Sequence, residues 1–142
     1  VERSRGLGDV YKRQDDIKRE QEQVSWADVI VVIYPLWWFD RPAILKGWFD
    51  RVFTNGYAFS FDESGLTGLL HNKRAMVVVT AGGTKEDFGK NADQLTKSTT
   101  EGTLAFCGIT DIVDRVFYSV TMVDDEARAA MLTELEQMVE NF

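Results

Sequence analysis

The sequence predicts an α/β protein built on a doubly wound parallel sheet, with helices on both faces in a three-layer α/β/α arrangement. Two observations lead to this prediction. Three apolar runs rich in β-branched residues, 29–34, 75–80 and 111–120, alternate with helical segments along the chain. The first run, VIVVIY, is apolar without interruption, which is typical of a parallel strand covered on both faces.

The first half of the chain contains a helix, a strand, a loop and a second helix. Residues 15–26 are a charged helical stretch that begins with two acidic residues, which favour the positive end of a helix dipole. Pro35 ends the strand 29–34. Pro42 suits the first position of a helix over 43–53, whose apolar residues fall on one face.

The second half repeats this alternation after a long connection. Residues 54–74 are mixed in character and about as long as an active-site loop or excursion. The strand 75–80 follows, and then a glycine turn and a polar loop lead into a helix over 93–107 that ends at a glycine. A third strand, 111–120, precedes a final amphipathic helix over 124–139.

Composition excludes several classes of function. The chain has 142 residues, a formal charge of −7 and no basic stripe, so we expect no nucleic-acid partner. No apolar run approaches the roughly 20 residues needed to span a bilayer, so we expect no membrane insertion. The single cysteine, Cys107, cannot form an internal disulfide, which fits a cytoplasmic protein. With His71 as the only histidine, far from Cys107 in the sequence, no metal site is predicted.

The first fourteen residues differ from the rest. They hold four basic and two acidic residues, a net charge of +2, which leaves −9 for the remaining 128 residues. Residues 4–14, SRGLGDVYKRQ, are similar to the translation of a transposon-tagmentation sequencing adapter. We therefore expect residues 1–14 to be adapter-derived and disordered, and residues 15–142 to form the C-terminal part of a single domain.

Ligands of an open parallel sheet bind beyond the carboxyl ends of its strands, where an aromatic loop is predicted. Trp37, Trp38 and Phe39 are consecutive in this loop, so they cannot all point the same way and at least one must meet solvent or a ligand. Flat side chains of this kind suit a flat aromatic ligand. Packing against the core beneath the loop is the alternative.

A glycine turn follows the next strand. Gly82 and Gly83 allow backbone N–H groups to approach a ligand with no Cβ in the way, and the Thr80 hydroxyl adds a polar contact. This combination suits the polar edge of a heterocycle. An ordinary strand-to-helix turn would have the same sequence.

Together these segments resemble the flavodoxin-like NAD(P)H:quinone oxidoreductases. That family includes the DT-diaphorase type, the bacterial modulator-of-drug-activity type and the ancillary reductases of potassium-efflux systems. The resemblance covers residues 15–120 and extends to the final helix, and it is most specific over 35–59, PLWWFDRPAILKGWFDRVFTNGYAF. The motifs TAGG at 80–83 and LAFCG at 104–108 occur in the family's order.

The resemblance implies a flavodoxin-like sheet and a non-covalently bound FMN or FAD. The cofactor would take hydride from NAD(P)H and pass it to a quinone or another small electron acceptor. A homodimer is also implied. By this resemblance the cofactor-binding residues are Pro35, Leu36, Trp37, Trp38 and Phe39 along the ring, Thr80, Gly82 and Gly83 at its polar edge, and Phe88 beyond the glycine turn.

The sequence also departs from the family. The DT-diaphorase type has a tyrosine and a histidine beyond the glycine turn, and Phe88 and Gln94 take those positions here, so no catalytic side chain is assigned. The family's first two strands, first helix and phosphate-binding loop would all precede residue 15. We therefore expect the chain to fold poorly, bind flavin poorly and be inactive as it stands.

Two other functions fit the same features. A flavodoxin-type electron carrier would also be acidic, although a carrier needs neither the aromatic loop nor the long 54–74 connection. A redox-sensing regulatory subunit of a potassium-efflux system is the other alternative.

Overall fold

The structure, a computed structural model, describes residues 7–142. Its centre is a parallel sheet of β1 (Val29–Pro35), β4 (Arg74–Thr80) and β5 (Asp111–Phe117), in the order β1-β4-β5. Pro35 is level with Thr80, and Thr80 with Phe117, so the three carboxyl ends form one edge. This arrangement confirms the predicted parallel α/β fold.

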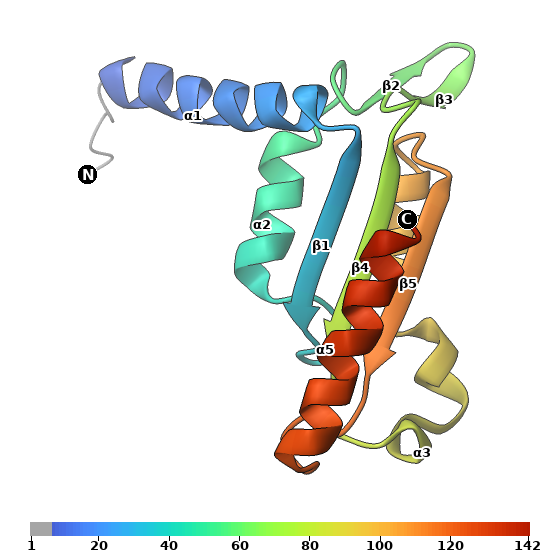
Figure 1. Ribbon diagram of the computed structural model, residues 1–142. Coiled ribbons are helices and arrows are strands. Elements are labelled where there is room, and N and C mark those ends of the chain that lie inside the picture. Colours follow the sequence, from blue (N-terminus) through green and yellow to red (C-terminus); the bar gives the residue numbers. More distant parts are fainter. Residues whose placement is uncertain (1–6) are drawn as a thin grey trace.

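Helices cover the two faces of the sheet, with α2 (Ala43–Val52) on one face and α5 (Asp125–Glu140) on the other (Figure 1). The central strand β4 is buried on both sides: Val77 packs in the larger core under α2, whereas Met76 and Val78 pack under α5. Burial on both faces explains why its sequence is apolar at nearly every position.

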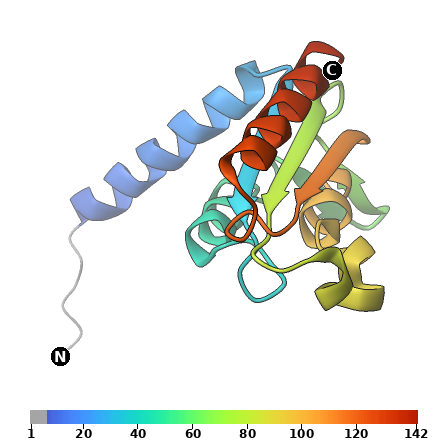
Figure 2. The same ribbon diagram turned by 60° about the horizontal axis from the view of Figure 1, so that its bottom comes forward.

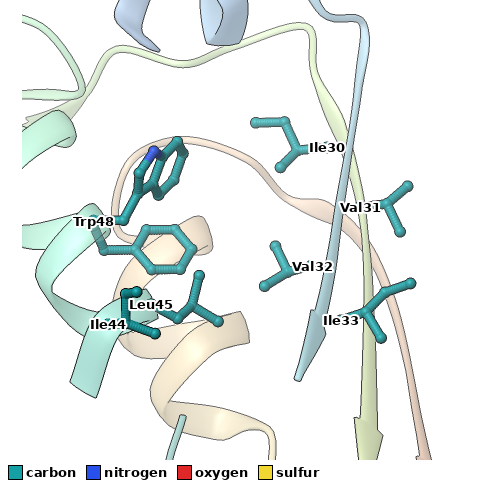
Figure 3. A pocket seen from close by; sticks show the side chains of 8 residues that line it. Ile30, Val31, Val32, Ile33, Ile44, Leu45 and Trp48 are labelled. Atoms are coloured by element: carbon teal, nitrogen blue, oxygen red, sulfur yellow. The ribbon is translucent and has the colours of Figure 1, made fainter. Parts of the chain in front are cut away.

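The strand β1 differs from the prediction on one face. Ile30 and Val32 point toward α2, but Val31 and Ile33 point to the other side, where they are 51% and 59% exposed (Figure 3). The reason is that α5 packs on β4 and β5, so it leaves the far edge of the sheet uncovered. The prediction that the run 29–34 is covered on both faces is therefore wrong for this structure.

The helix α1 (Leu7–Trp26) extends away from the rest of the molecule (Figure 2). Its last turns hold it in place, where Gln21 Nε2 donates to Val52 O at 2.9 Å and Trp48 Nε1 donates to a Glu20 oxygen at 3.0 Å. We expected disorder over 1–14, but the structure has helix from Leu7, since a helix formed at 15–26 propagates at one hydrogen bond per residue. Residues 1–6 lie outside the described residues.

The long connection 54–74 contains a hairpin that the sequence did not predict. Its antiparallel strands are β2 (Phe59–Asp62) and β3 (Gly65–Gly68). The connection joins the end of α2 to the start of β4, so the hairpin lies at the amino ends of the strands (Figure 1). Within this chain it is therefore at the opposite end of the sheet from the aromatic loop.

The segment before β5 is helical but irregular. In place of a polar loop and one helix over 93–107, the structure has α3 (Lys85–Phe88), a 3₁₀ segment (Gly89–Gln94), α4 (Lys97–Thr99) and a π-helical segment (Thr100–Ala105). Hydroxyl side chains bond back to main-chain carbonyls here, as Thr103 Oγ1 does to Ser98 O at 2.9 Å. Such bonds compete with a regular helix.

The remaining element boundaries shift by a few residues. The strand β5 ends at Phe117, three residues earlier than predicted, and Asp124 caps α5 by accepting a hydrogen bond from Ala127 N. No helix within residues 7–142 has both the length and the apolar character needed to cross a membrane.

Candidate functional site

The loop after β1 is a tight turn that exposes its aromatic side chains. Trp37 N donates to Asp40 O at 2.9 Å, and Asp40 N donates to Trp37 O at 3.0 Å. The two residues between them, Trp38 and Phe39, have φ angles of 51° and 63°, in a region where bulky side chains are rare. Trp37, Trp38 and Phe39 are 60%, 98% and 56% exposed. The alternative that these three rings pack into the core is therefore wrong for this chain.

Next to this turn lies the loop after β4. Leu36 N donates to Thr80 O at 2.8 Å, which continues the sheet one residue beyond Pro35. The carbonyls of Ala81 and Gly83 accept hydrogen bonds from Val120 and Ser119, so they face the loop after β5.

The amides of Gly82 and Gly83 remain available. Of residues 7–142, none accepts a hydrogen bond from either N–H. A Cβ added to Gly82 would meet no atom closer than Thr121 Oγ1, at 3.9 Å, so the space beside this residue is open. At Gly83 an added Cβ would lie 3.1 Å from Asp87 Oδ2. The first glycine thus borders open space, and the second is packed against α3.

Phe88 connects the two loops. Its ring is 5.5 Å from that of Phe39 in an edge-to-face arrangement, and 5.9 Å from the ring of Tyr118. Each of the three strands is therefore followed by an aromatic residue of one cluster. Sequence reasoning missed Tyr118 because the third strand was predicted to run on to residue 120. Its place just after an apolar run was the available signal.

A family model described as a flavodoxin-like fold matches residues 5–140. The chain belongs to this flavodoxin-like family. Among curated relatives, an uncharacterized NAD(P)H oxidoreductase of Haemophilus influenzae is 36% identical to this chain over 121 residues. The aligned region covers 83% of this chain and 59% of that protein. It is 36% identical over 140 residues to human ribosyldihydronicotinamide dehydrogenase (quinone), covering 93% of this chain and 61% of the human protein.

A solved NAD(P)H:quinone oxidoreductase from Methanothermobacter marburgensis is similar in structure, with a TM-score of 0.73 at 36% identity. The match covers 84% of this chain and 61% of that one. These relatives confirm the resemblance drawn from the sequence. The chain spans about three fifths of the length of these relatives.

Beneath the aromatic turn, the flavodoxin-like chain has a polar network that the sequence did not predict. The Asp40 carboxylate accepts hydrogen bonds from Ser98 Oγ at 2.6 Å and from Arg41 N at 2.7 Å. Burial alone would raise the pKa of Asp40, but these hydrogen bonds and the nearby Arg41 charge outweigh it and lower the pKa. Asp40 is therefore held as a carboxylate.

Arg41 lies deeper in the same network, only 8% exposed. Its Nη1 donates to Thr99 Oγ1 at 3.1 Å, and its guanidinium lies over the Phe49 ring, 4.9 Å from the centroid. Thr99 also shares a hydrogen bond of 2.9 Å with the Tyr34 hydroxyl, whose pKa burial raises. A charged residue directly before Pro42 was the one signal for this network in the sequence.

Taken together, the carboxyl edge of the sheet offers aromatic surfaces and two free N–H donors. No group of three potential His, Cys, Asp or Glu ligands that could hold a metal occurs in the part of the chain that the structure describes. Cys107 is buried beyond the π-helical segment, and burial raises the pKa of its thiol to about 11, so it is not a ready nucleophile. The site is suited to binding a flat polar heterocycle rather than to proton transfer by its own side chains.

Proposed function

We propose that the protein is a flavin-dependent NAD(P)H oxidoreductase that reduces quinones or similar small electron acceptors. The observation that carries this proposal is the pairing of the exposed Trp37–Asp40 turn with the free amides of Gly82 and Gly83 at one edge of the sheet. The names of the relatives support the same reaction.

The residues present fit a flavin. Its isoalloxazine ring is flat and aromatic along most of its length, and one edge carries carbonyl and nitrogen acceptors. Trp37, Trp38 and Phe39 would lie along the ring, with Pro35, Leu36 and Phe88 supporting their positions, and the amides of Gly82 and Gly83 with the Thr80 hydroxyl would donate to the polar edge. When bound, the flavin would supply the hydride chemistry between NAD(P)H and the acceptor.

The chain's own contribution is orientation and electrostatics. With the flavin bound, the two N–H donors of Gly82 and Gly83 would lie at one edge of the ring and would stabilise negative charge that develops there. The aromatic side chains would exclude water from the ring faces that they cover. FMN or FAD, held without a covalent bond, a homodimeric assembly and a cytoplasmic location complete the proposal.

Nuclear magnetic resonance tests the binding step directly. Because we expect this chain to bind flavin only weakly as it stands, FMN is added in large excess to the 15N-labelled chain, and the amide signals are followed. We expect the amides of Gly82 and Gly83 and the indole signals of Trp37 and Trp38 to shift together, while the β2–β3 hairpin signals stay in place. No shifts, or shifts concentrated at the hairpin, would contradict the proposed site.

An electron carrier is a second candidate, favoured by the formal charge of −7. The two functions differ in one measurement. With flavin bound, an oxidoreductase consumes NADH or NADPH in the presence of a quinone without any added reductase, whereas a carrier leaves both nucleotides unoxidised. Flavin binding without nucleotide oxidation would favour the carrier.

A further inference from the structure

We infer that Asp40 and Arg41 are positioning residues that hold the aromatic turn Trp37–Asp40 in its left-handed conformation by fastening it to Ser98 and Thr99. The effect on flavin rests on the proposed function, but the fastening itself does not.

The conformation of the turn has to be stabilised by contacts with other residues. Trp38 and Phe39 both have positive φ angles, a conformation that tight turns normally assign to asparagine and glycine. Non-glycine residues persist in this region only when the surrounding structure enforces it. Within the turn, the enforcing contacts are the two reciprocal hydrogen bonds between Trp37 and Asp40.

Asp40 is the first attachment. It is the last residue of the turn, and its carboxylate accepts the hydrogen bond from Ser98 Oγ at 2.6 Å. Ser98 belongs to α4, which is 58 residues away in the sequence. This bond joins the end of the turn to the helical segment that precedes β5.

Arg41 is the second attachment, one residue further on. Its Nη1 reaches Thr99 Oγ1 at 3.1 Å and Ser98 O at 3.4 Å. Thr99 is fully buried and also bonds to the hydroxyl of Tyr34 on β1. The strand β1, the residue directly after the turn and α4 therefore meet at one threonine hydroxyl.

Stability alone does not explain a guanidinium in this place. Arg41 Nε is buried with no hydrogen-bond partner, and among residues 14–142 no carboxylate lies within 4.0 Å of the guanidinium. A buried charge without an ion pair is costly, and an apolar side chain stacked on Phe49 would avoid that cost. What the guanidinium adds is a directional link to Ser98 and Thr99, and hence a defined position for the turn.

The test is hydrogen exchange at the amides of Trp37 and Asp40, the two reciprocal donors of the turn. Ser98→Ala removes the bond to Asp40, and Arg41→Met keeps the stacking on Phe49 but removes the link to Thr99. In both variants we expect these amides to exchange about tenfold faster, because a hydrogen bond to a charged group is lost. Ser98→Thr keeps a hydroxyl and should keep the original rates.

Two controls separate positioning from general stability. Arg51→Met removes a guanidinium from the exposed face of α2 and should leave the turn amides unchanged. Exchange of the buried amide of Val77 reports global unfolding. Turn amides that keep their rates, or that accelerate only in step with Val77, would overturn the inference. If Arg41→Met fails to fold, the exchange rates of the turn amides in Ser98→Ala alone decide whether the inference holds.

An FMN titration of the same variants distinguishes the inference from the proposed function. Weaker shifts at Gly82 and Gly83 in Ser98→Ala than in the parent chain would support both. Faster turn exchange together with no FMN response in any variant would uphold the positioning role and reject the flavin site. Unchanged exchange together with a normal FMN response would reject the positioning role and uphold the flavin site.

Discussion

At the residue scale, the exposed rings of Trp38 and Phe39 come at a cost in backbone free energy. A left-handed conformation costs an L-residue roughly 1–2 kcal/mol, and glycine avoids that cost. Trp38 recovers little of it through packing, because its side chain is 98% exposed. The proposed role of the turn in ligand binding would account for a strained residue that packing does not stabilise.

Replacing Trp38 by glycine should therefore separate the two effects. We expect Trp38→Gly to raise the free energy of unfolding by about 1 kcal/mol, because the strained φ is relieved and almost no contact is lost. FMN binding should weaken in the same variant. Urea unfolding followed by far-ultraviolet circular dichroism measures the first effect, and the FMN titration measures the second.

Trp26→Gly is the matched control, since Trp26 is also highly exposed but ends the helix α1. That variant should show no gain in stability. A Trp38→Gly protein less stable than its parent would mean that the ring makes contacts that matter for folding.

Gly82 allows a second test at this scale. An added methyl group would meet no described atom closer than 3.9 Å, so Gly82→Ala should change the free energy of unfolding by less than about 0.5 kcal/mol. The same methyl group would occupy the space from which a ligand reaches the amide, so we expect FMN binding about tenfold weaker. Gly47→Ala, on α2 with open space around it, should leave FMN binding unchanged. Equal FMN binding by both variants would show that Gly82 is not part of the binding site.

Asp40 gives the site a pH dependence. Hydrogen bonds and the Arg41 charge lower its pKa in the folded protein, so its contribution to stability is present above its ordinary pKa and is lost as the pH falls through the lowered value. Asp40→Asn lacks this contribution at every pH. The difference in free energy of unfolding between parent and variant should therefore be largest near neutral pH and shrink on acidification below about pH 4. Urea unfolding across that range measures it, and a difference independent of pH would refute the assignment.

At the scale of elements, the sequence predicted those features that local pattern determines. The apolar run at 75–80 correctly indicated the strand β4, which the structure buries on both faces. The run of β1 has the same pattern, yet one of its faces is exposed, because a pattern reports which environment suits a strand and not whether a neighbour is present. Three consecutive aromatics were enough to predict an exposed ring after β1.

Other elements depend on contacts that no local pattern contains. The strands of the β2–β3 hairpin have only four residues each, and β3 begins and ends with glycine, so the sequence resembles a loop. Arg41 is buried between the Phe49 ring and acceptors that α4 supplies from more than fifty residues later in the sequence. The polar network at the site could therefore not be predicted from the sequence, whereas the exposed aromatic loop and the glycine turn could.

The hairpin is fixed to the domain by a close backbone approach, which yields a prediction for one glycine. A Cβ added to Gly68 would lie 2.3 Å from Gly108 N, so the β3 backbone cannot stay where it is if a side chain is present. We expect Gly68→Ala to lower the free energy of unfolding by about 1–3 kcal/mol. Thr67→Ala, at the exposed neighbouring position, should change it far less. Urea unfolding of both variants checks this, and similar values would show that the hairpin adjusts freely.

At the scale of the whole molecule, the sheet is well covered at β4 but has an exposed edge strand, β1. Beside the free edge of β1, a groove of about 430 Å³ is lined by Ile30 and Val32 of the strand and by Leu45 and Trp48 of α2 (Figure 3). On the opposite face a second apolar groove, of about 410 Å³, includes Ile33. An edge strand with apolar surface on both faces is a template for pairing with another chain.

This geometry predicts that the chain associates with itself through β1 as its concentration rises. Ile33→Lys places a charge beside the free edge on the exposed face, where it costs little in the monomer but opposes pairing. We expect sedimentation velocity at increasing concentration to show less association for Ile33→Lys than for the parent. Leu66→Lys is the control, because it adds the same charge on the hairpin, at the other end of the molecule from the carboxyl edge. This variant should associate as much as the parent does. A parent chain that stays monomeric and binds one FMN per chain would show instead that the β1 edge needs no partner, and that three strands suffice for the site.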